Sequence, residues 1–315
     1  MLDIVDFPLV TVITVTYNSG NYVKDTISGV LQQDYPSIEY IIGDDCSSDN
    51  TWAVINEFQD PRIKAYRNSE NLKEYNNRNK ALNKASGKYL IFVDGDDIIY
   101  PHAIRTFVYY LEKFPKACMA IQKGYFNNVI FPILLEPRES YVNYFFGEQN
   151  LMMSSFASNF FRTDLLQSYQ LSTEYLSGDD EVRLRLAANF PILYIPGWLT
   201  WPRETPGQAS SKITEELDII QKTNYVKAIL KNKNQISGDN ELSTLIEMKL
   251  NDRAIKSLRN SLMRGKIKRF ISFRKRLGIR WLNLITKHPS RPPQDVLSLS
   301  SPTIPLSCKM GDAKK

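Results

Sequence analysis

Buried-strand patterns alternate with helical patterns through the N-terminal third of the chain. Residues 10–16 (VTVITVT) are β-branched throughout, which is typical of a fully buried parallel strand. Further short apolar runs predict strands at residues 38–42, 62–66 and 89–93. Apolar residues at helical spacing predict three helices. The first ends at about residue 33, the second begins after the cap residue Asp49, and the third covers residues 72–85. This alternation with short links predicts an α/β sheet with right-handed crossovers.

The pattern is less regular in the rest of the chain. Helices are expected at residues 102–114, 179–188, 212–232 and 241–262, a strand is expected at 117–122, and SNFFRTDLL should run from a strand into a short helix. Residues 291–315 are rich in proline and serine, which indicates disorder. We therefore predict an α/β domain over residues 1–210, with halves at 1–100 and 101–210, a helical extension over 211–288 and a disordered tail over 289–315.

Three polar clusters follow predicted strands of the sheet. Tyr17 follows the first strand, Asp44 and Asp45 follow the second, and DGDD at residues 94–97 follows the strand at 89–93. In open α/β sheets ligands bind beyond the carboxyl ends of the strands. The three clusters are therefore expected to line one site.

The DGDD segment concentrates three carboxylates. Alternation along an extended backbone puts Asp94 and Asp96 on one side and Asp97 on the other, while Gly95 lets a ligand approach the main chain. Carboxylates at an apolar strand end repel each other and lose solvation unless a cation lies between them. Their hard oxygen atoms suit Mg²⁺ or Mn²⁺, which seldom bind without substrate phosphates. The alternative is a solvated acidic turn.

Composition limits the class of protein. Hydrophobic residues make up 43% of the chain, enough for a globular core. No apolar run approaches the roughly 18 residues of a membrane span, and the start MLDIVDFPLV lacks the basic region of a signal peptide. Three widely spaced cysteines suit a reducing cytosol. Two histidines argue against a histidine-built metal site or a Ser-His-Asp triad.

Three long segments carry a joint pattern in a fixed order. They are VTVITVTYNSGNYVKDTISGVLQQDYPSIEYIIGDDCSSDNT, NNRNKALNKASGKYLIFVDGDD and SGDDEVRLRLA. Together they resemble the nucleotide-binding opening, the metal-binding centre and the base-bearing segment of the family 2 inverting glycosyltransferases, over about residues 8–211. The resemblance implies a GT-A fold, which has a Rossmann-like nucleotide-binding half and a mixed central sheet, followed here by a helical, basic extension.

The resemblance also implies roles for the acidic and basic site residues. Asp94 and Asp96 match the family's D-x-D pair, with Asp96 the more direct ligand of Mn²⁺ or Mg²⁺ and Asp94 nearer the ribose. Arg78 matches a basic residue that faces the phosphates or the base of the nucleotide. Asp179 matches the catalytic base, and the adjacent Asp180 is the alternative. Both aspartates could instead be carboxylates favoured by the dipole at a helix N-terminus.

Further implied roles concern the base of the nucleotide and the loops around it. The backbone near Val15 and the ring of Tyr17 would hold uracil or another base, and Asp45 would accept a hydrogen bond from it, while Asp44 supports the loop and Gly95 lies between the metal-binding aspartates. Cys46 stands where the family usually has glycine, a tolerable departure if the backbone there needs no positive φ.

Three other points stay open at this stage. Tyr17 could simply cover the sheet edge, and Arg78 could pair with Glu74 on its own helix. Thr205 stands in the segment where the family often has a histidine that reaches the metal or diphosphate.

The implied activity is metal-dependent, inverting transfer of a sugar from a nucleotide-sugar, most simply a UDP-sugar, to a hydroxyl group. The acceptor would be a glycan or lipid-linked glycan in bacterial surface polysaccharide synthesis. The alternatives are sugar transfer to a polyprenyl phosphate, and a catalytically weak scaffold subunit that binds nucleotide-sugars without turnover.

Basic charge is concentrated near the C-terminus. Residues 251–290 carry a net charge of +11, residues 291–315 carry +2, and residues 1–250 carry −7. An apolar stripe that includes Ile255, Leu258, Ile267, Phe270 and Ile271 runs through the basic stretch. It continues at Leu262, Leu277, Trp281, Leu282 and Ile285, and Gly265 and Gly278 could divide it into shorter helices.

Such a stretch suits an anionic bilayer surface. We therefore expect a cytoplasmic protein that is peripheral at the inner face of the cell membrane. The alternatives are a helix packed on the α/β domain and a nucleic-acid-binding arm, which the acidic body disfavours.

Overall fold

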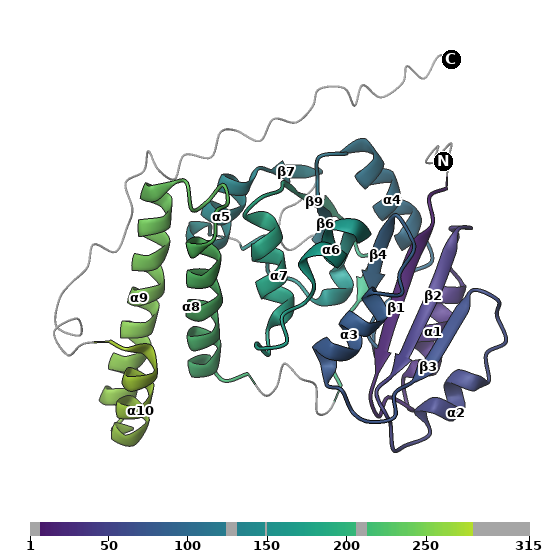
Figure 1. Cartoon of the computed structure of the whole chain (residues 1–315), viewed down its shortest axis with the longest axis horizontal. Helices are drawn as coiled ribbons and strands as arrows, with labels where there is room; N and C mark the ends of the chain where they lie inside the picture. Colours follow the sequence, from purple (N-terminus) through teal and green to yellow (C-terminus); the bar gives the residue numbers. More distant parts are fainter. Residues whose placement is uncertain (1–6, 124–130, 149, 206–212, 280–315) are drawn as a thin grey trace, which may run out of the picture.

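The computed structural model describes residues 7–123, 131–148, 150–205 and 213–279 (Figure 1). Within these ranges an eight-stranded mixed sheet forms the centre. In spatial order its strands are β3 (Ile63–Arg67), β2 (Ile38–Asp44), β1 (Val10–Thr16), β4 (Tyr89–Phe92), β8 (Asn159–Arg162), β6 (Met119–Lys123), β9 (Ile192–Pro196) and β7 (Ile133–Leu135). The strand β1 is parallel to β2 and β4, whereas β8 is antiparallel to β4 and β6. The predicted α/β class with a mixed central sheet is confirmed.

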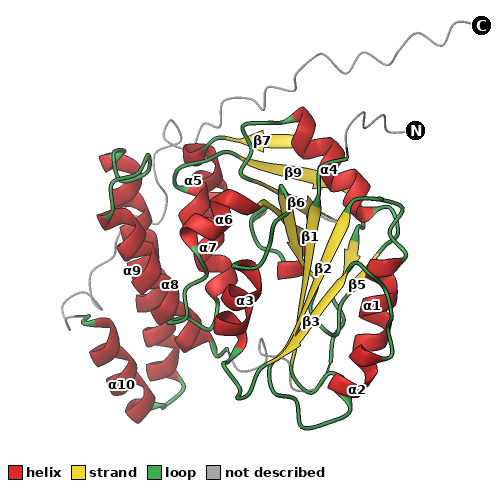
Figure 2. Ribbon diagram, turned by 45° about the vertical axis from the view of Figure 1, so that its right-hand side comes forward, coloured by secondary structure: helices red, strands yellow, loops and turns green. Residues whose placement is uncertain are grey.

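Helices cover both faces of the sheet (Figure 2). One face packs on α1 (Val23–Leu31), α2 (Thr51–Asn56) and α4 (Ala103–Lys113), and the other on α3 (Glu74–Leu82), α5 (Pro137–Phe146), α6 (Thr163–Tyr169) and α7 (Gly178–Ala187). Because side chains alternate along a strand, Val12 of β1 packs on the face covered by α1, α2 and α4, and Ile13 packs on the opposite face. The sheet is thus buried on both sides.

Three helices follow the sheet: α8 (Glu215–Lys231), α9 (Asn240–Met263) and α10 (Ile267–Leu277). The helix α8 packs on α7, and its buried residues Tyr225, Val226 and Ile229 belong to the same hydrophobic cluster as α7. Gly265 and Gly278 have φ of +66° and lie at the ends of α9 and α10, as the sequence predicted. The predicted C-terminal helical extension is confirmed. No helix within the described ranges combines the length and apolar character that crossing a bilayer requires.

Two local features differ from the sequence-based expectation. The predicted cap Asp49 is wrong by one residue, because α2 begins after Asn50, although Asp49 still accepts a hydrogen bond from the backbone N–H of Thr51. A small second sheet pairs β5 (Ile98–Ile99) with β10 (Thr200–Trp201) in antiparallel fashion. These strands are too short to leave a periodic signal, yet they bring the chain after Trp201 beside the DGDD segment.

Candidate active site

The three polar clusters lie together at one edge of the sheet. The adjacent parallel strands end in register, with Thr16 of β1 beside Asp44 of β2. The backbone N–H of Asp45 donates to the carbonyl of Thr16 at 2.8 Å, and that of Gly95 donates to the carbonyl of Val15 at 3.3 Å. A Cβ added at Gly95 would lie 2.8 Å from Cγ2 of Thr16. This close approach of the backbones requires glycine there.

Arg78 of α3 is buried beneath Asp94. The Nη2 atom of Arg78 lies 2.7 Å from Oδ1 of Asp94 and 3.1 Å from Oε1 of Glu74, and its side chain is 3% exposed. Its guanidinium group also lies against the rings of Phe92 and Phe156, with 5.3 and 4.7 Å to the centroids. The pairing with Glu74 considered from the sequence and a contact to Asp94 therefore both occur. In this arrangement Arg78 fixes the position of Asp94.

The other two carboxylates of the DGDD segment have different surroundings. The hydroxyl of Thr205 donates to Oδ2 of Asp96 at 2.6 Å. Asp97 is buried, and Oδ1 accepts the backbone N–H of Arg203 at 3.1 Å. Burial, followed by repulsion from Asp94 and Asp96, raises the pKa of Asp97 to about 8. Asp97 is thus disfavoured as a carboxylate mainly by its burial, and the two neighbouring carboxylates add to this effect.

The fit of a divalent ion follows from this donor set. No three side chains of the types that commonly ligate metals converge within the described part of the chain. However, Mg²⁺ is usually held by one or two carboxylates together with substrate phosphates. Asp96 and Asp94 can supply such carboxylates, and Asp96 is the less engaged of the two because Asp94 is paired with Arg78. The residues present therefore fit Mg²⁺ or Mn²⁺ bound together with a nucleotide.

The residues expected around the base lie beside the DGDD segment. Tyr17 is 53% exposed and follows β1 directly. Asp45 is buried, and its carboxylate accepts hydrogen bonds from Nδ2 of Asn68 and from the backbone N–H groups of Leu72 and Lys73, at 2.8–3.0 Å. Asp45 therefore holds the segment between β3 and α3, and its contact with a base stays a prediction.

Two neighbouring residues determine the loop after β2. The buried carboxylate of Asp44 accepts from the hydroxyl of Thr16 at 3.1 Å and lies 3.3 Å from Nε of Arg67, which fits its expected role in loop support. The next residue, Cys46, has φ of +61°. The condition under which cysteine would be a tolerable departure, a backbone without positive φ, is therefore not met. The loop keeps the left-handed conformation that favours glycine, and the thiol of Cys46 donates to the carbonyl of Ser69 at 3.6 Å.

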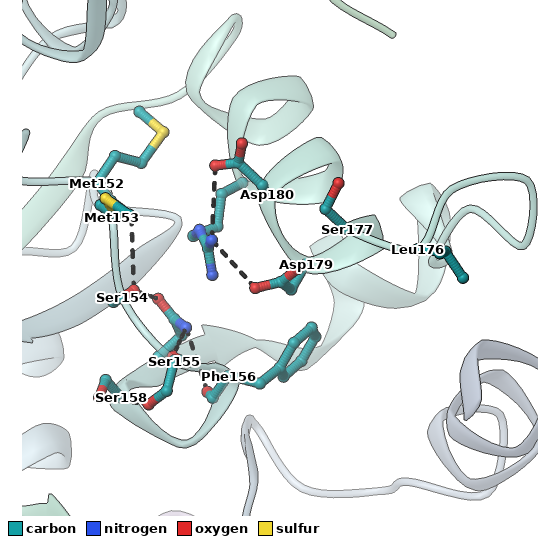
Figure 3. Close-up of polar contacts among 12 residues, drawn as sticks. Met152, Met153, Ser154, Ser155, Phe156, Ser158, Leu176, Ser177, Asp179 and Asp180 are labelled. Carbon is teal, nitrogen blue, oxygen red and sulfur yellow. Dashed lines mark hydrogen bonds and ion pairs between the residues drawn. The ribbon is translucent and has the colours of Figure 1, made fainter. Parts of the chain in front are cut away.

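The two candidate bases at the start of α7 have unequal environments (Figure 3). Asp180 accepts hydrogen bonds from the hydroxyls of Tyr144 and Tyr225 at 2.5 and 2.6 Å, and lies 3.2 Å from Nζ of Lys222. Burial opposes its ionisation, but Lys222, Arg183 and the two hydroxyls outweigh burial and lower the pKa of Asp180 to about 2.

Asp179 is the more open of the two. Its side chain is 26% exposed, against 14% for Asp180, and Oδ2 accepts from Nη2 of Arg183 at 3.2 Å. A general base needs a free oxygen within reach of the substrate hydroxyl. The geometry therefore supports Asp179, and it gives Asp180 a structural role between α7 and α8.

The helix α3 connects the D-x-D pair with Asp179. Arg78 of α3 contacts Asp94, while the hydroxyl of Tyr75, one turn earlier, accepts from the backbone N–H of Asp179 at 3.4 Å. Burial and then repulsion from both Asp94 and Asp179 raise the pKa of Glu74, and Arg78 opposes this effect. The carboxylates of Asp94 and Asp179 therefore both act on the ionisation of Glu74. Asp94 and Asp179 both lie beside the N-terminal part of α3.

Two side chains that support the site, Arg183 and Phe156, were not predicted from the sequence. Arg183 pairs with both Asp179 and Asp180, and Figure 3 shows the segment from Met152 to Phe156 across from these two aspartates. Phe156 packs on Arg78 and on Phe92. The spacing of four residues between Asp179 and Arg183 in a predicted helix could have identified Arg183. No sequence signal identifies Phe156, because it reaches Arg78 from a distant part of the chain.

Removing the carboxylate of Asp180 should destabilise the protein. We expect Asp180→Ala to lower the free energy of unfolding by about 3 kcal/mol, because Lys222 and two buried hydroxyls lose their partner. The folded-state pKa of Asp180 is lowered, so its contribution to stability is complete above about pH 4 and is lost as the pH falls toward 2. Urea unfolding at pH 7 and pH 3 measures both effects. An unchanged midpoint at pH 7 would contradict the structural role.

Part of the chain is similar in sequence to known proteins. The sequence model described as "Glycosyl transferase family 2" matches residues 11–169. WfaP of Escherichia coli, a UDP-Glc:alpha-D-GlcNAc-diphosphoundecaprenol beta-1,3-glucosyltransferase, is 36% identical over 104 residues, which are 33% of this chain and 41% of WfaP. The chain spans 36%, 33% and 41% of the length of the first curated relatives that it matches.

Solved structures share the fold. TarS 1–349 of Staphylococcus aureus, in complex with UDP-GlcNAc, has a TM-score of 0.61 at 18% identity, over 79% of this chain and 73% of that one. The mannosyltransferase PcManGT of Pyrobaculum calidifontis, in complex with GDP-Man and Mn²⁺, has a TM-score of 0.57 at 16% identity, over 93% and 85%. Together with the eight-stranded mixed sheet of the described residues, this likeness confirms the predicted GT-A fold.

Proposed function

The chain belongs to glycosyl transferase family 2, and from this premise we propose that it is a metal-dependent, inverting glycosyltransferase that uses a nucleotide-sugar, most simply a UDP-sugar. The observation that carries the proposal is that Asp94 and Asp179 both lie against α3, at Arg78 and at Tyr75 one turn earlier, and that each is paired with a buried arginine. A metal-binding carboxylate and a general base facing the same space are what this reaction needs.

The donor half of the proposed site is the edge formed by β1, β2 and β4. Val15 and Tyr17 receive the base together with Asp45, and Gly95 allows the nucleotide to approach the backbone. Mn²⁺ or Mg²⁺ bound by Asp96 and Asp94 would stabilise the negative charge that develops on the departing diphosphate. Arg78 holds Asp94 in position, and Thr205, which contacts Asp96, occupies the side from which the family's histidine would act.

The acceptor half is centred on Asp179. Asp179 takes the proton of the acceptor hydroxyl as that oxygen attacks the sugar, a contribution commonly worth about 10²–10⁴-fold. Arg183 orients Asp179 through a charge-assisted hydrogen bond. Attack from the side opposite the diphosphate inverts the anomeric centre, so no nucleophile of the enzyme is needed.

The acceptor that we propose is a glycan or lipid-linked glycan of a bacterial surface polysaccharide. WfaP transfers glucose from UDP-Glc to a lipid-linked sugar, and TarS of S. aureus is a poly(ribitol-phosphate) beta-N-acetylglucosaminyltransferase. Both relatives support a surface-glycan acceptor for this chain. The corresponding location is the inner face of the cell membrane. Residues 1–210 would form the catalytic domain and 211–288 the extension.

A donor screen tests the proposed activity. We expect a UDP-sugar with Mn²⁺ to raise the melting temperature and to be hydrolysed slowly, and GDP- and dTDP-sugars to do neither at the same concentration. A ligand at 100 times its Kd stabilises the folded state by about 2.7 kcal/mol, which a thermal shift detects. Stabilisation without any turnover of donor, with or without acceptor, would instead identify a binding scaffold. A response independent of Mn²⁺ and Mg²⁺ would contradict the proposed metal dependence.

A further inference from the structure

Exposed apolar residues gather where α9 ends and α10 begins. Every residue from 262 to 269 is exposed. Leu262, Met263, Ile267 and Ile271 have exposed fractions between 49% and 77%. We call these four residues the α9–α10 tip. The tip lies at one extremity of the molecule in Figure 1. Several exposed apolar side chains on one short stretch differ from the isolated ones found on most protein surfaces.

The tip does not contribute to the packing of its own helices. The buried side of α10 carries Phe270 and Phe273, which pack with Ile255 and Leu258 of α9. Ile267 and Ile271 are one turn apart on α10 and lie on another side of the helix. The structure therefore divides the apolar stripe seen in the sequence. Part of it joins α9 and α10, and the tip is left over.

This division corrects the expectation that the whole apolar stripe of the basic stretch, residues 251–290, faces a bilayer. Ile255, Leu258 and Phe270 are buried within the protein and are not available to a bilayer, so the alternative of packing on the rest of the chain is realised for them. Leu262, Ile267 and Ile271 remain exposed. Trp281, Leu282 and Ile285 lie outside the described residues.

Basic side chains surround the tip. Arg264, Lys266, Lys268, Lys275 and Arg276 are all exposed. Lys268 and Lys275 are seven residues apart on α10 and therefore lie on one side of it, next to the side that carries Ile267 and Ile271. Residues 251–290 carry a net charge of +11, whereas residues 1–250 carry −7. An apolar patch within a basic surface is complementary to the acyl chains and headgroups of an anionic bilayer.

The position of the tip relative to the candidate site is the second observation. In Figure 1 the strand β1 runs toward the lower end of the view, which is also where α9 meets α10. The tip and the site edge thus belong to the same end of the molecule. A bilayer that contacts the tip would therefore lie at the same end of the molecule as the candidate site.

We propose that the α9–α10 tip docks the protein on a membrane surface that contains anionic lipids. The apolar side chains enter the boundary between headgroups and acyl chains, and the surrounding lysines and arginines contact the headgroups. The purpose of this contact rests on the proposed function, because a lipid-linked acceptor is presented at such a surface. The contact itself does not depend on catalysis, so it can be tested by binding alone.

Cosedimentation with vesicles tests the proposal on the full chain. One variant combines Leu262→Gln, Met263→Gln, Ile267→Gln and Ile271→Gln, and a second combines Lys266→Gln, Lys268→Gln and Lys275→Gln. We expect the wild type to bind phosphatidylglycerol-containing vesicles at least tenfold more tightly than purely zwitterionic ones. Each variant should lose at least tenfold in binding, and raising the salt concentration should weaken the wild type. Arg269 is left unchanged because it pairs with Glu216.

The control variant changes exposed residues outside the tip: Lys113→Gln, Lys116→Gln and Phe131→Gln. It should bind vesicles as the wild type does, and far-UV circular dichroism should be the same for all proteins. Equal binding by the wild type and both tip variants would overturn the proposal, as would binding insensitive to anionic lipid. A concentration-dependent oligomer abolished by the first variant, without any vesicle binding, would assign the tip to self-association instead. Donor hydrolysis in the absence of vesicles should be unchanged in both tip variants, so a failure of docking is distinct from a failure of the proposed activity.

Discussion

Replacing Asp96 by alanine is expected to abolish sugar transfer and the metal-dependent part of donor binding while the fold stays intact. Asp96 is partly exposed, and Oδ2 accepts a hydrogen bond from the hydroxyl of Thr205. Removing the carboxylate of Asp96 therefore leaves no buried charged group unpaired. The neighbouring Asp94 is engaged with Arg78 and is a poorer substitute as a ligand of the cation. Isothermal titration of UDP with and without Mn²⁺, together with a transfer assay, measures both losses.

Thr205 provides the matched control for Asp96. Thr205→Val removes the hydrogen bond to Asp96 but leaves the carboxylate of Asp96 in place. Metal-dependent binding should therefore persist in this variant. Thermal unfolding of Asp96→Ala should match that of the wild type, because a partly exposed side chain away from the core is being shortened. If Asp96→Ala binds UDP with the wild-type dependence on Mn²⁺, Asp96 is not a ligand and the proposed donor site is wrong.

Replacing Asp179 by asparagine is expected to lower turnover by about 10²-fold or more with little change in donor affinity. Asparagine keeps the shape of the side chain but cannot accept the proton of the acceptor hydroxyl, and the loss should fall on kcat rather than on KM for the donor. Arg183 keeps its ion pair with Asp180 in this variant, so the free energy of unfolding should change little. Steady-state kinetics with a saturating acceptor, alongside urea unfolding, separates the two quantities.

Asp180→Asn is the natural control, because it alters the adjacent carboxylate by the same chemistry. Its expected loss is in stability, since two tyrosine hydroxyls and Lys222 contact that carboxylate. A folded Asp180→Asn protein without turnover, next to an active Asp179→Asn protein, would mean that the base has been assigned one residue too early.

The predicted boundary at residue 210 stays a proposal, but the packing bears on it. The helix α8 contributes Lys222 and Tyr225 to Asp180 of α7, and Ile229 joins the hydrophobic cluster of the α/β domain. Deleting the chain after residue 210 would therefore expose Asp180 and part of that core. An experiment on the extension is better made with surface substitutions in the full chain than with a truncated protein.

The sequence alone determined the features that depend on short-range pattern. A run of β-branched residues such as VTVITVT can bury both faces only as an inner strand, and glycines such as Gly265 and Gly278 end helices because they adopt positive φ without strain. The joining of the three polar clusters at one edge also followed, because the carboxyl ends of parallel strands meet there.

Only the tertiary structure distinguished residues that share the same local pattern. Asp179 and Asp180 are adjacent in sequence, and they differ because Tyr144 and Tyr225, from two other helices, reach Asp180 alone. Likewise Phe270 is buried and Ile271 is exposed because α9 covers one side of α10. The physical reason is the same in both cases. Burial and charge pairing are set by residues far away in the sequence, and these come into contact only when the chain folds.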